Sequence, residues 1–417
     1  ADDSVTIVGW MKDMPAEAWE KGRSVEILRN NIFMDKQESF VAAMDSTGRF
    51  SVRVPLVNTS EIYIDIGRKG INTVVEPGET YFLLHDFSTG HVLFMGEDVR
   101  LQNELQTHPP LYVDGYLRKG QGTVDEFRIQ MEEKYRHAVE ELSRRVEEHP
   151  NLSRRYRYYM ESFVLTGLGC SMMQVRFAVP GWQLPEDYVD FVRTKVWQRP
   201  PKPYTLCQTF STLMRDYIDH SSEAKDKVRG DVTFNAFESL QQRGEISMTE
   251  EEVNAVEAYQ LVVRELQEKL NAEPSDSLRQ RMVVEFGKSD LGQRFISLFK
   301  RFEDVLNEEV LADNIDFWKE NAESVGCDSI LCQIHLARNL YRQIDNIRKP
   351  LPDRMMTKAE REIRLEGGWD IVSREQEKYV AIQNRDLSGV GSLKSAEDVK
   401  DVTGGEALLR KLTEPYR

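Results

Sequence analysis

The sequence predicts an α+β protein in which an N-terminal antiparallel β-sandwich precedes a large all-α helical domain. Two observations carry this prediction. Up to about Gly96, apolar and polar residues alternate at every second position, which is typical of half-buried strands. After Glu97 the apolar period becomes 3.6 residues, as in amphipathic helices. We therefore expect a sandwich over residues 1–97 and a helical domain over residues 98–403.

Seven or eight short strands at close spacing are expected in the first region. The segment 40–56 predicts a hairpin with Gly48 in its turn, where positive φ is needed. The segment 71–84 predicts a second hairpin, because the Pro77 and Gly78 pair is typical of a type II turn.

The segment EIYIDIG has clear strand alternation. Its isoleucines share one face and its other residues take the opposite face: Ile62, Ile64 and Ile66 against Glu61, Tyr63 and Asp65. This pattern favours a strand in the sandwich core.

Capping boxes predict the starts of two long helices in the second region. Thr123 with Glu126 and Thr249 with Glu252 have the required spacing. The first of these helices is expected to stop at His149, before a proline. Further helices are predicted over residues 152–169, 185–197, 205–219, 291–307, 331–347 and 358–384. No repeat motif of fixed period accompanies them, so the sequence does not indicate a tetratricopeptide array.

Composition and charge limit the function classes. The 417 residues are 40% hydrophobic and 30% charged, as in folded proteins that bury a sizeable core. The net charge of −15 repels a phosphate backbone, so nucleic acid is not an expected partner. The apolar runs are only a few residues long, so no transmembrane segment is expected. The first residue is Ala and not Met, which we interpret as a sign of an exported chain that has lost its signal peptide.

The four cysteines are interpreted as structural. Cys170 and Cys207 stand in apolar segments, where a buried thiol acts as a small hydrophobic group. Cys327 and Cys332 are five positions apart. On one helix that spacing separates two side chains by about 140°, which is wrong for a disulfide or a shared metal.

Neither the histidines nor the glycines form a recognisable active-site motif. The seven histidines have no HExxH or HxxxH spacing, and His85, His91 and His335 are each expected to be structural. The Gly67–Gly70 segment is interpreted as a basic turn between strands. We accordingly expect no catalytic, metal-binding or cofactor-binding residue in this chain, and no cofactor.

Two segments resemble binding motifs but have simpler interpretations. The segment RRYRYYM mixes Arg and Tyr as a nucleic-acid surface does, yet on a helix Tyr156, Tyr159 and Met160 form one buried face. The proline-rich segment 198–204 has the composition of a PxxP ligand, but between two helical patterns it favours a rigid connector.

Both ends of the chain carry a family resemblance. Ser46, Gly48 and Phe50 form a Ser-x-Gly-x-Phe element, a strand follows, and residues 76–79 form a Glu-Pro-Gly-Glu turn. This order resembles the N-terminal β-domain of TlpA/ResA-type thioredoxin-like envelope proteins. The closing stretch GGEALLRKLTEPYR, residues 404–417, is similar to the helix that leads into the thioredoxin domain of that family.

The resemblance implies a non-catalytic region that selects substrates for, or scaffolds, an envelope thiol-disulfide oxidoreductase. It further implies a covalently linked thioredoxin-like domain after Arg417, an envelope protein or peptide as substrate, and a periplasmic or cell-envelope location, including that of a lipid-anchored exported protein. The family's WCxxC motif does not occur in this chain, so none of its redox residues can be transferred.

Two other function classes remain open. One is an envelope protein with no redox role that binds a peptide or glycan on the sandwich or in the groove between sandwich and helices. The other is a hydrolase whose catalytic residues come together from distant positions.

Overall fold

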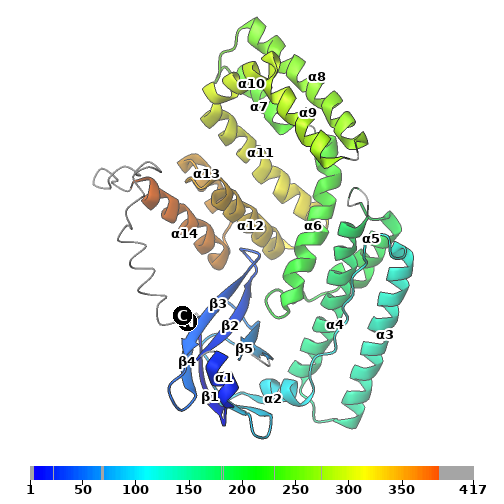
Figure 1. Ribbon diagram of the computed structural model, residues 1–417, viewed down its shortest axis with the longest axis vertical. Coiled ribbons are helices and arrows are strands. Elements are labelled where there is room, and N and C mark those ends of the chain that lie inside the picture. Colours follow the sequence, from blue (N-terminus) through cyan, green and yellow to red (C-terminus); the bar gives the residue numbers. More distant parts are fainter. Residues whose placement is uncertain are drawn as a thin grey trace.

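The computed structural model describes residues 4–21, 23–66, 70–179, 181, 183–229, 231–273 and 275–384. Within these ranges an eight-stranded β-sandwich is followed by helices, which confirms the predicted α+β class. Figure 1 shows the sandwich at one end of the molecule, with helices beside it and above it. The predicted lead-in helix 404–417 and residues 67–69 of the basic turn lie outside the described ranges.

The sandwich consists of two four-stranded sheets. The first has the order β4-β1-β7-β8 and the second the order β3-β2-β5-β6. Pairing is antiparallel except between β1 and β7, which are parallel. The strands are β1 (Ser4–Lys12), β2 (Ser24–Asn31), β3 (Lys36–Ala43), β4 (Arg49–Pro55), β5 (Ser60–Asp65), β6 (Gly70–Val75), β7 (Thr80–Asp86) and β8 (His91–Met95), with a short helix α1 (Ala16–Lys21) after β1.

Both predicted turns form, but the predicted hairpins are wrong. Gly48 has φ +81° and Gly78 has φ +84°, as the turn sequences require. Each turn carries the chain from one sheet to the other, because β3 pairs with β2 and β4 with β1, while β6 pairs with β5 and β7 with β1. A turn sequence fixes where the chain reverses, whereas the partner of each strand is fixed by long-range packing.

The sandwich core is formed by the predicted alternating residues. Ile62, Ile64, Phe50 and Val54 are buried between the sheets. Glu61, on the opposite face of β5, is also buried. That second face is therefore covered by other parts of the chain, which strand alternation alone did not predict.

The chain becomes helical between Met95 and Arg100. The α-helices of the described region are α2 (Arg100–Thr107), α3 (Val124–Glu148), α4 (Arg154–Gln174), α5 (Glu186–Val192), α6 (Gln208–Arg229), α7 (Val232–Gln242), α8 (Glu250–Ala272), α9 (Asp276–Lys288), α10 (Asp290–Arg301), α11 (Glu303–Ser324), α12 (Ser329–Ile347), α13 (Asp353–Glu362) and α14 (Glu366–Gln383). A 3-10 turn η1 (Val175–Ala178) follows α4, and a π-helical turn η3 (Arg193–Trp197) follows α5.

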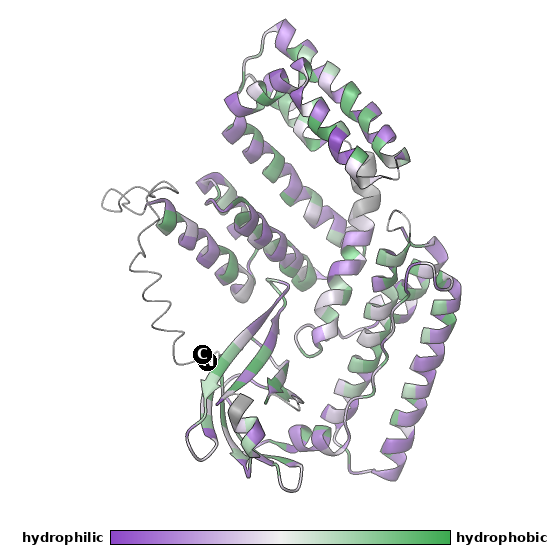
Figure 2. Cartoon of the chain, in the orientation of Figure 1, coloured by the Kyte–Doolittle hydropathy of each residue, from purple (hydrophilic) through white to green (hydrophobic). Residues whose placement is uncertain are grey.

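Both capping boxes are present, at Thr123 of α3 and Thr249 of α8, and α3 ends before His149 as predicted. Figure 2 shows hydrophobic and hydrophilic residues alternating around the helices, as the 3.6-residue period requires. Two segments predicted as single helices are each broken in two. One break is at Phe302, between α10 and α11, and the other is at residues 363–365, between α13 and α14.

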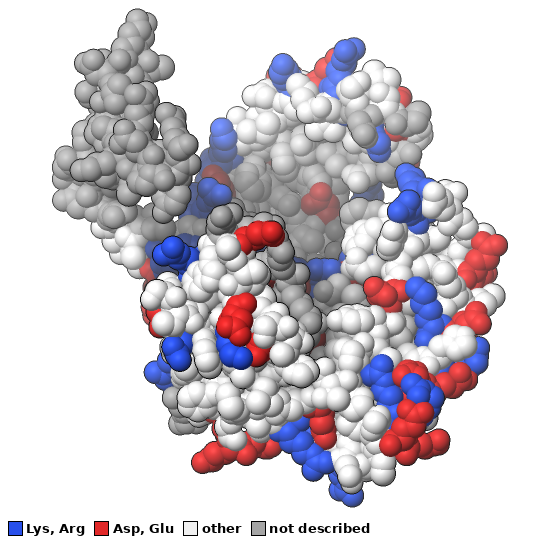
Figure 3. Space-filling view, turned by 60° about the horizontal axis from the view of Figure 1, so that its bottom comes forward, with Lys and Arg blue, Asp and Glu red and all other residues white. Residues whose placement is uncertain are grey.

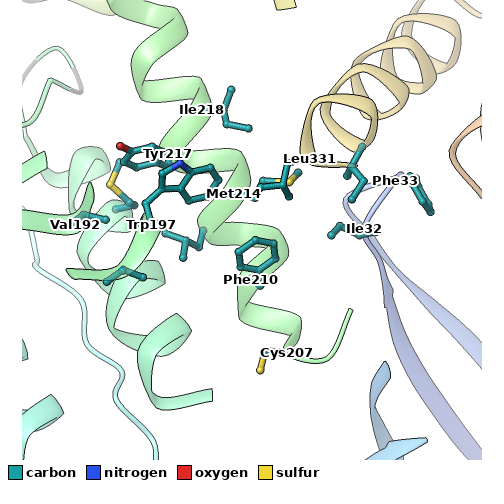
Figure 4. Packing of buried hydrophobic residues seen from close by; sticks show 14 of the residues in the cluster. Ile32, Phe33, Val192, Trp197, Cys207, Phe210, Met214, Tyr217, Ile218 and Leu331 are labelled. Carbon is teal, nitrogen blue, oxygen red and sulfur yellow. The ribbon is translucent and has the colours of Figure 1, made fainter. Parts of the chain in front are cut away.

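The β2–β3 turn inserts into the helical core. Ile32 and Phe33 belong to the same buried cluster as Trp197, Phe210 and Leu331. Figure 4 shows Trp197 and Tyr217 side by side at α6, with Leu331 of α12 and the two turn residues Ile32 and Phe33 further across. The sandwich and the helices therefore share one hydrophobic core at this turn.

A buried charge network holds the same turn. Asp35, which ends the turn, lies 3.0 Å from Arg215 of α6, 2.6 Å from Arg342 of α12 and 3.7 Å from Arg338 of α12. The Arg338 guanidinium donates to the carbonyl oxygen of Ile32 at 2.6 Å and 3.1 Å. These contacts occupy the charged groups, so we interpret the network as structural.

Candidate functional site

A cavity of about 290 Å³ lies where the sandwich meets the helices. Its wall comes from five separate parts of the chain: the segment before β5, the β6–β7 turn, the start of α2, the first turns of α4, and the connector between η3 and α6. The lining residues are Asn58, Thr59, Glu76, Leu101, Arg155, Tyr158, Tyr159, Lys202, Pro203, Tyr204, Thr205 and Leu206.

Hydrogen bonds to β5 fix the connector as one wall of this cavity. The Thr205 hydroxyl donates to the carbonyl oxygen of Thr59 at 2.7 Å, and the amide of Glu61 donates to the carbonyl oxygen of Thr205 at 3.2 Å. Both bonds are made by Thr205, which follows the proline-rich part of the connector. The predicted connector between two helical segments is confirmed, and it also forms part of the candidate site.

The buried carboxylate of Glu61 joins three elements behind the cavity. It accepts a hydrogen bond from the Tyr159 hydroxyl of α4 at 3.0 Å and from the amide of Gln208, the first residue of α6, at 2.8 Å. Burial raises the pKa of Glu61 and outweighs the two hydrogen bonds, which lower it. Glu61 therefore fixes the position of the cavity wall, and we assign it a positioning role.

Two cations and one anion line the cavity. Arg155 is neutralised by Glu76 and by Asp98, whose Oδ2 lies 2.6 Å from its Nη1. Lys202 has no hydrogen bond or ion pair within the described part of the chain, and its Nζ lies 4.8 Å from the ring centroid of Trp197. Burial lowers the pKa of Lys202. The cavity thus offers one partly buried ammonium group, in a chain whose net charge is −15.

Tyrosines give the cavity aromatic surface. Tyr158 is 39% exposed, and Tyr204 is half-buried with its hydroxyl donating to Asp328 Oδ2 at 3.0 Å. Burial raises the pKa of Tyr204 to about 12, so its hydroxyl keeps its proton at neutral pH. An ammonium group beside tyrosine rings suits a ligand that combines an anionic group with flat or apolar surface.

The interpretation of RRYRYYM as core packing is confirmed. Tyr156, Tyr159 and Met160 are buried, and Arg155 beside them pairs with carboxylates. One side of this segment faces the cavity through Arg155 and Tyr158, which the sequence reasoning did not anticipate. The only sequence signal for the site was the pairing of an aromatic-basic segment with a proline-rich connector, and each had a simpler interpretation when taken alone.

Two of the histidines that were expected to be structural, His85 and His335, are buried. His85 is buried and stacks on Phe87 with the ring centroids 4.2 Å apart. His335 is buried in α12, where burial lowers its pKa to about 3. Within the described ranges no group of three or more His, Cys, Asp or Glu side chains has a geometry that could hold a metal ion.

The cysteines occupy two kinds of environment. Cys207 is fully buried, as expected, and Cys170 is half-buried against the helical core. Cys327 lies before the start of α12, so the assumption that it shares a helix with Cys332 is wrong.

Neither the charge distribution on the surface nor the comparison with known proteins identifies a ligand for this site. On the face that Figure 3 shows, acidic and basic side chains are interspersed. Among the described helices, none has the length and apolar character needed to cross a bilayer. No family model, curated protein or solved structure matches the chain.

Proposed function

We propose that this chain is the non-catalytic, substrate-selecting region of an envelope thiol-disulfide oxidoreductase, and that the cavity between sandwich and helices binds an acidic segment of the protein substrate. The observation that carries the binding part is Lys202, a partly buried ammonium group that makes no hydrogen bond or ion pair in the described chain and feels the charge of Asp328 only at longer range. A buried cation gains most when a ligand supplies a carboxylate, because water competes weakly there. The link to an oxidoreductase rests on the resemblance of the two chain ends.

A peptide-binding assay tests the selecting role. We expect acidic peptides that contain tyrosine to raise the thermal unfolding midpoint, and their charge-reversed counterparts to leave it unchanged. Lys202→Met removes the ammonium group, and losing one charge-assisted contact of about 1.5–3 kcal/mol weakens binding by roughly tenfold to a hundredfold. Lys195→Met is the matched control, because Lys195 is exposed and lies outside the cavity. Equal losses in the two variants would contradict the assignment of Lys202.

The redox link requires a separate measurement. Intact mass of the protein purified from its natural source, with and without a thiol-alkylating reagent, reports whether a further domain with two alkylatable cysteines follows Arg417. If such a domain is missing, the oxidoreductase role is excluded and the binding role stands alone.

The second candidate is an envelope peptide- or glycan-binding protein with no redox role. It is favoured by the side chains of Tyr158 and Tyr204 beside Asn58 and Thr59, since sugars bind through stacking on aromatic rings and hydrogen bonds to small polar groups. Neutral oligosaccharides that raise the unfolding midpoint equally in wild type and Lys202→Met would favour this candidate over an acidic peptide.

A further inference from the structure

Cys327 and Cys332 stand on either side of the start of α12. Asp328 is the N-cap residue, and its side chain accepts a hydrogen bond from the amide of Leu331 at 2.9 Å. Cys327 is the residue before the cap, and Cys332 is the fourth residue of the helix. Side chains at these two positions commonly contact each other across a helix start. The angular argument that separated the two thiols does not apply, because it required both residues to be helical.

The side chain of Cys332 turns back towards Cys327. Its Sγ lies 3.7 Å from the carbonyl oxygen of Cys327, although the two residues are five positions apart. Both cysteines are only half-buried, whereas Cys207 is fully buried. The pair is therefore preorganised and is open to a small molecule from solvent.

The surroundings assign different roles to the two thiols. The contact between the two thiols lowers the pKa of Cys332 and, together with burial, raises the pKa of Cys327. The Cys332 thiol donates to the backbone carbonyl oxygen of Cys327. The carboxylates of Asp328 and Glu323 oppose a thiolate on Cys332. The positive end of the helix dipole at the start of α12 and the charge of Lys319 favour it. Cys332 is thus the better nucleophile. Cys327 is placed to attack a mixed disulfide that has formed on Cys332.

We propose that Cys327 and Cys332 form a reversible disulfide site that exchanges with low-molecular-weight disulfides. The Cys332 thiolate attacks one sulfur of the small disulfide, which forms a mixed disulfide and releases one small thiolate. The Cys327 thiol then loses its proton and attacks Cys332 Sγ, which closes the Cys327–Cys332 bond and releases the second small thiolate. The protein loses two electrons and two protons, and the small disulfide is reduced to two thiols. This inference is independent of the proposed cavity ligand.

The test uses the whole reduced chain and oxidised glutathione. After incubation and alkylation, the tryptic peptide 320–338 carries both cysteines, because no Lys or Arg lies between Lys319 and Arg338. We expect this peptide to lose the mass of two hydrogen atoms and to escape alkylation. Excess reduced glutathione is expected to restore both alkylatable thiols.

Two conservative variants separate the roles. Cys327→Ser is expected to accumulate one glutathione on Cys332, because the resolving thiol is missing. Cys332→Ser is expected to react at least tenfold more slowly, because Cys327 is the weaker nucleophile. Wild type that retains bound glutathione, or in which both thiols stay alkylatable at every glutathione ratio, would overturn the proposal. Cys207 in the same sample is the internal control for a buried thiol and is expected to be alkylated only after denaturation.

Discussion

Replacing Arg338 by Met tests whether the charge network holds the sandwich to the helices. Arg338 is 1% exposed. Met keeps an unbranched stem but lacks the guanidinium, so the change removes the charge and the hydrogen bonds and leaves the space of that group unfilled. Burial lowers the pKa of Arg338 to about 10, and the side chain therefore remains charged at neutral pH. Both of its acceptor residues, Ile32 and Ser211, lie on other elements.

The expected loss follows from the groups left without a donor. The carbonyl oxygen of Ile32 loses two donated bonds, and Ser211 loses bonds of 2.9 Å to its hydroxyl and 3.4 Å to its carbonyl oxygen. A buried polar group left unsatisfied costs about 1–3 kcal/mol. Asp35 keeps Arg215 and Arg342 without Arg338, so the expected loss comes from the carbonyl oxygen of Ile32 and from Ser211. Arg342→Met is the matched control. Arg342 is one-third exposed, and Asp35 retains Arg215 without it, so we expect a loss of about 1 kcal/mol.

Denaturant unfolding and hydrogen exchange measure this difference. We expect Arg338→Met to lower the unfolding midpoint more than Arg342→Met does, and to speed amide exchange in residues 31–36, where the β2–β3 turn meets the helices. Equal midpoints for the two variants would refute the reasoning. Unchanged exchange in the turn would show that the hydrophobic insertion of Ile32 and Phe33 holds it without the arginine.

Two further predictions concern single positions in the sandwich. The raised pKa of Glu61 means that its carboxyl favours the folded state when protonated, so its contribution falls as pH rises from the ordinary glutamate value of about 4.3 through the folded-state pKa. Gln does not titrate, so Glu61→Gln lacks this loss of stability. The unfolding free energy of Glu61→Gln minus that of wild type, measured by urea titration, is therefore expected to increase from pH 4 to pH 8. A difference that does not change with pH would contradict this prediction. Gly48→Ala is expected to cost about 2–4 kcal/mol, because φ is +81° and a Cβ would lie 2.4 Å from the carbonyl oxygen of Met11. Gly90→Ala, with φ +73° and open space around it, is expected to cost about 1 kcal/mol, and thermal unfolding of both variants compares them.

Local signals predicted the elements better than their partners. Thr123 and Thr249 mark helix starts because a capping box is complete within four residues. The break before α14 has no such signal. There the amides of Arg364 and Leu365 donate to Gln333 Oε1 of α12 instead of to their own helix. A bond to a residue more than thirty positions away cannot be inferred from the segment itself.

The candidate site was hidden for the same reason. Glu61 alternates correctly with the isoleucines of its strand, and the pattern alone assigns it to the side away from the sandwich core. Its burial depends on Tyr159 and on Gln208, which are about 100 and 150 positions further along the chain. The cavity is lined by these segments together with the β6–β7 turn and the start of α2. Periodicity predicts each element separately and does not show which elements pack together.

The cysteine pair shows how one boundary residue decides a chemical interpretation. With Cys327 inside a helix, the two side chains diverge by about 140° and no disulfide is expected. With Asp328 as the extended cap residue, Cys327 lies outside the helix and Cys332 folds back over the helix start. Helix starts are uncertain by one or two residues when only the sequence is known. An angular argument across a helix start is therefore sound only once the cap is identified, and CDSILC contains its own cap in the aspartate that follows the first cysteine.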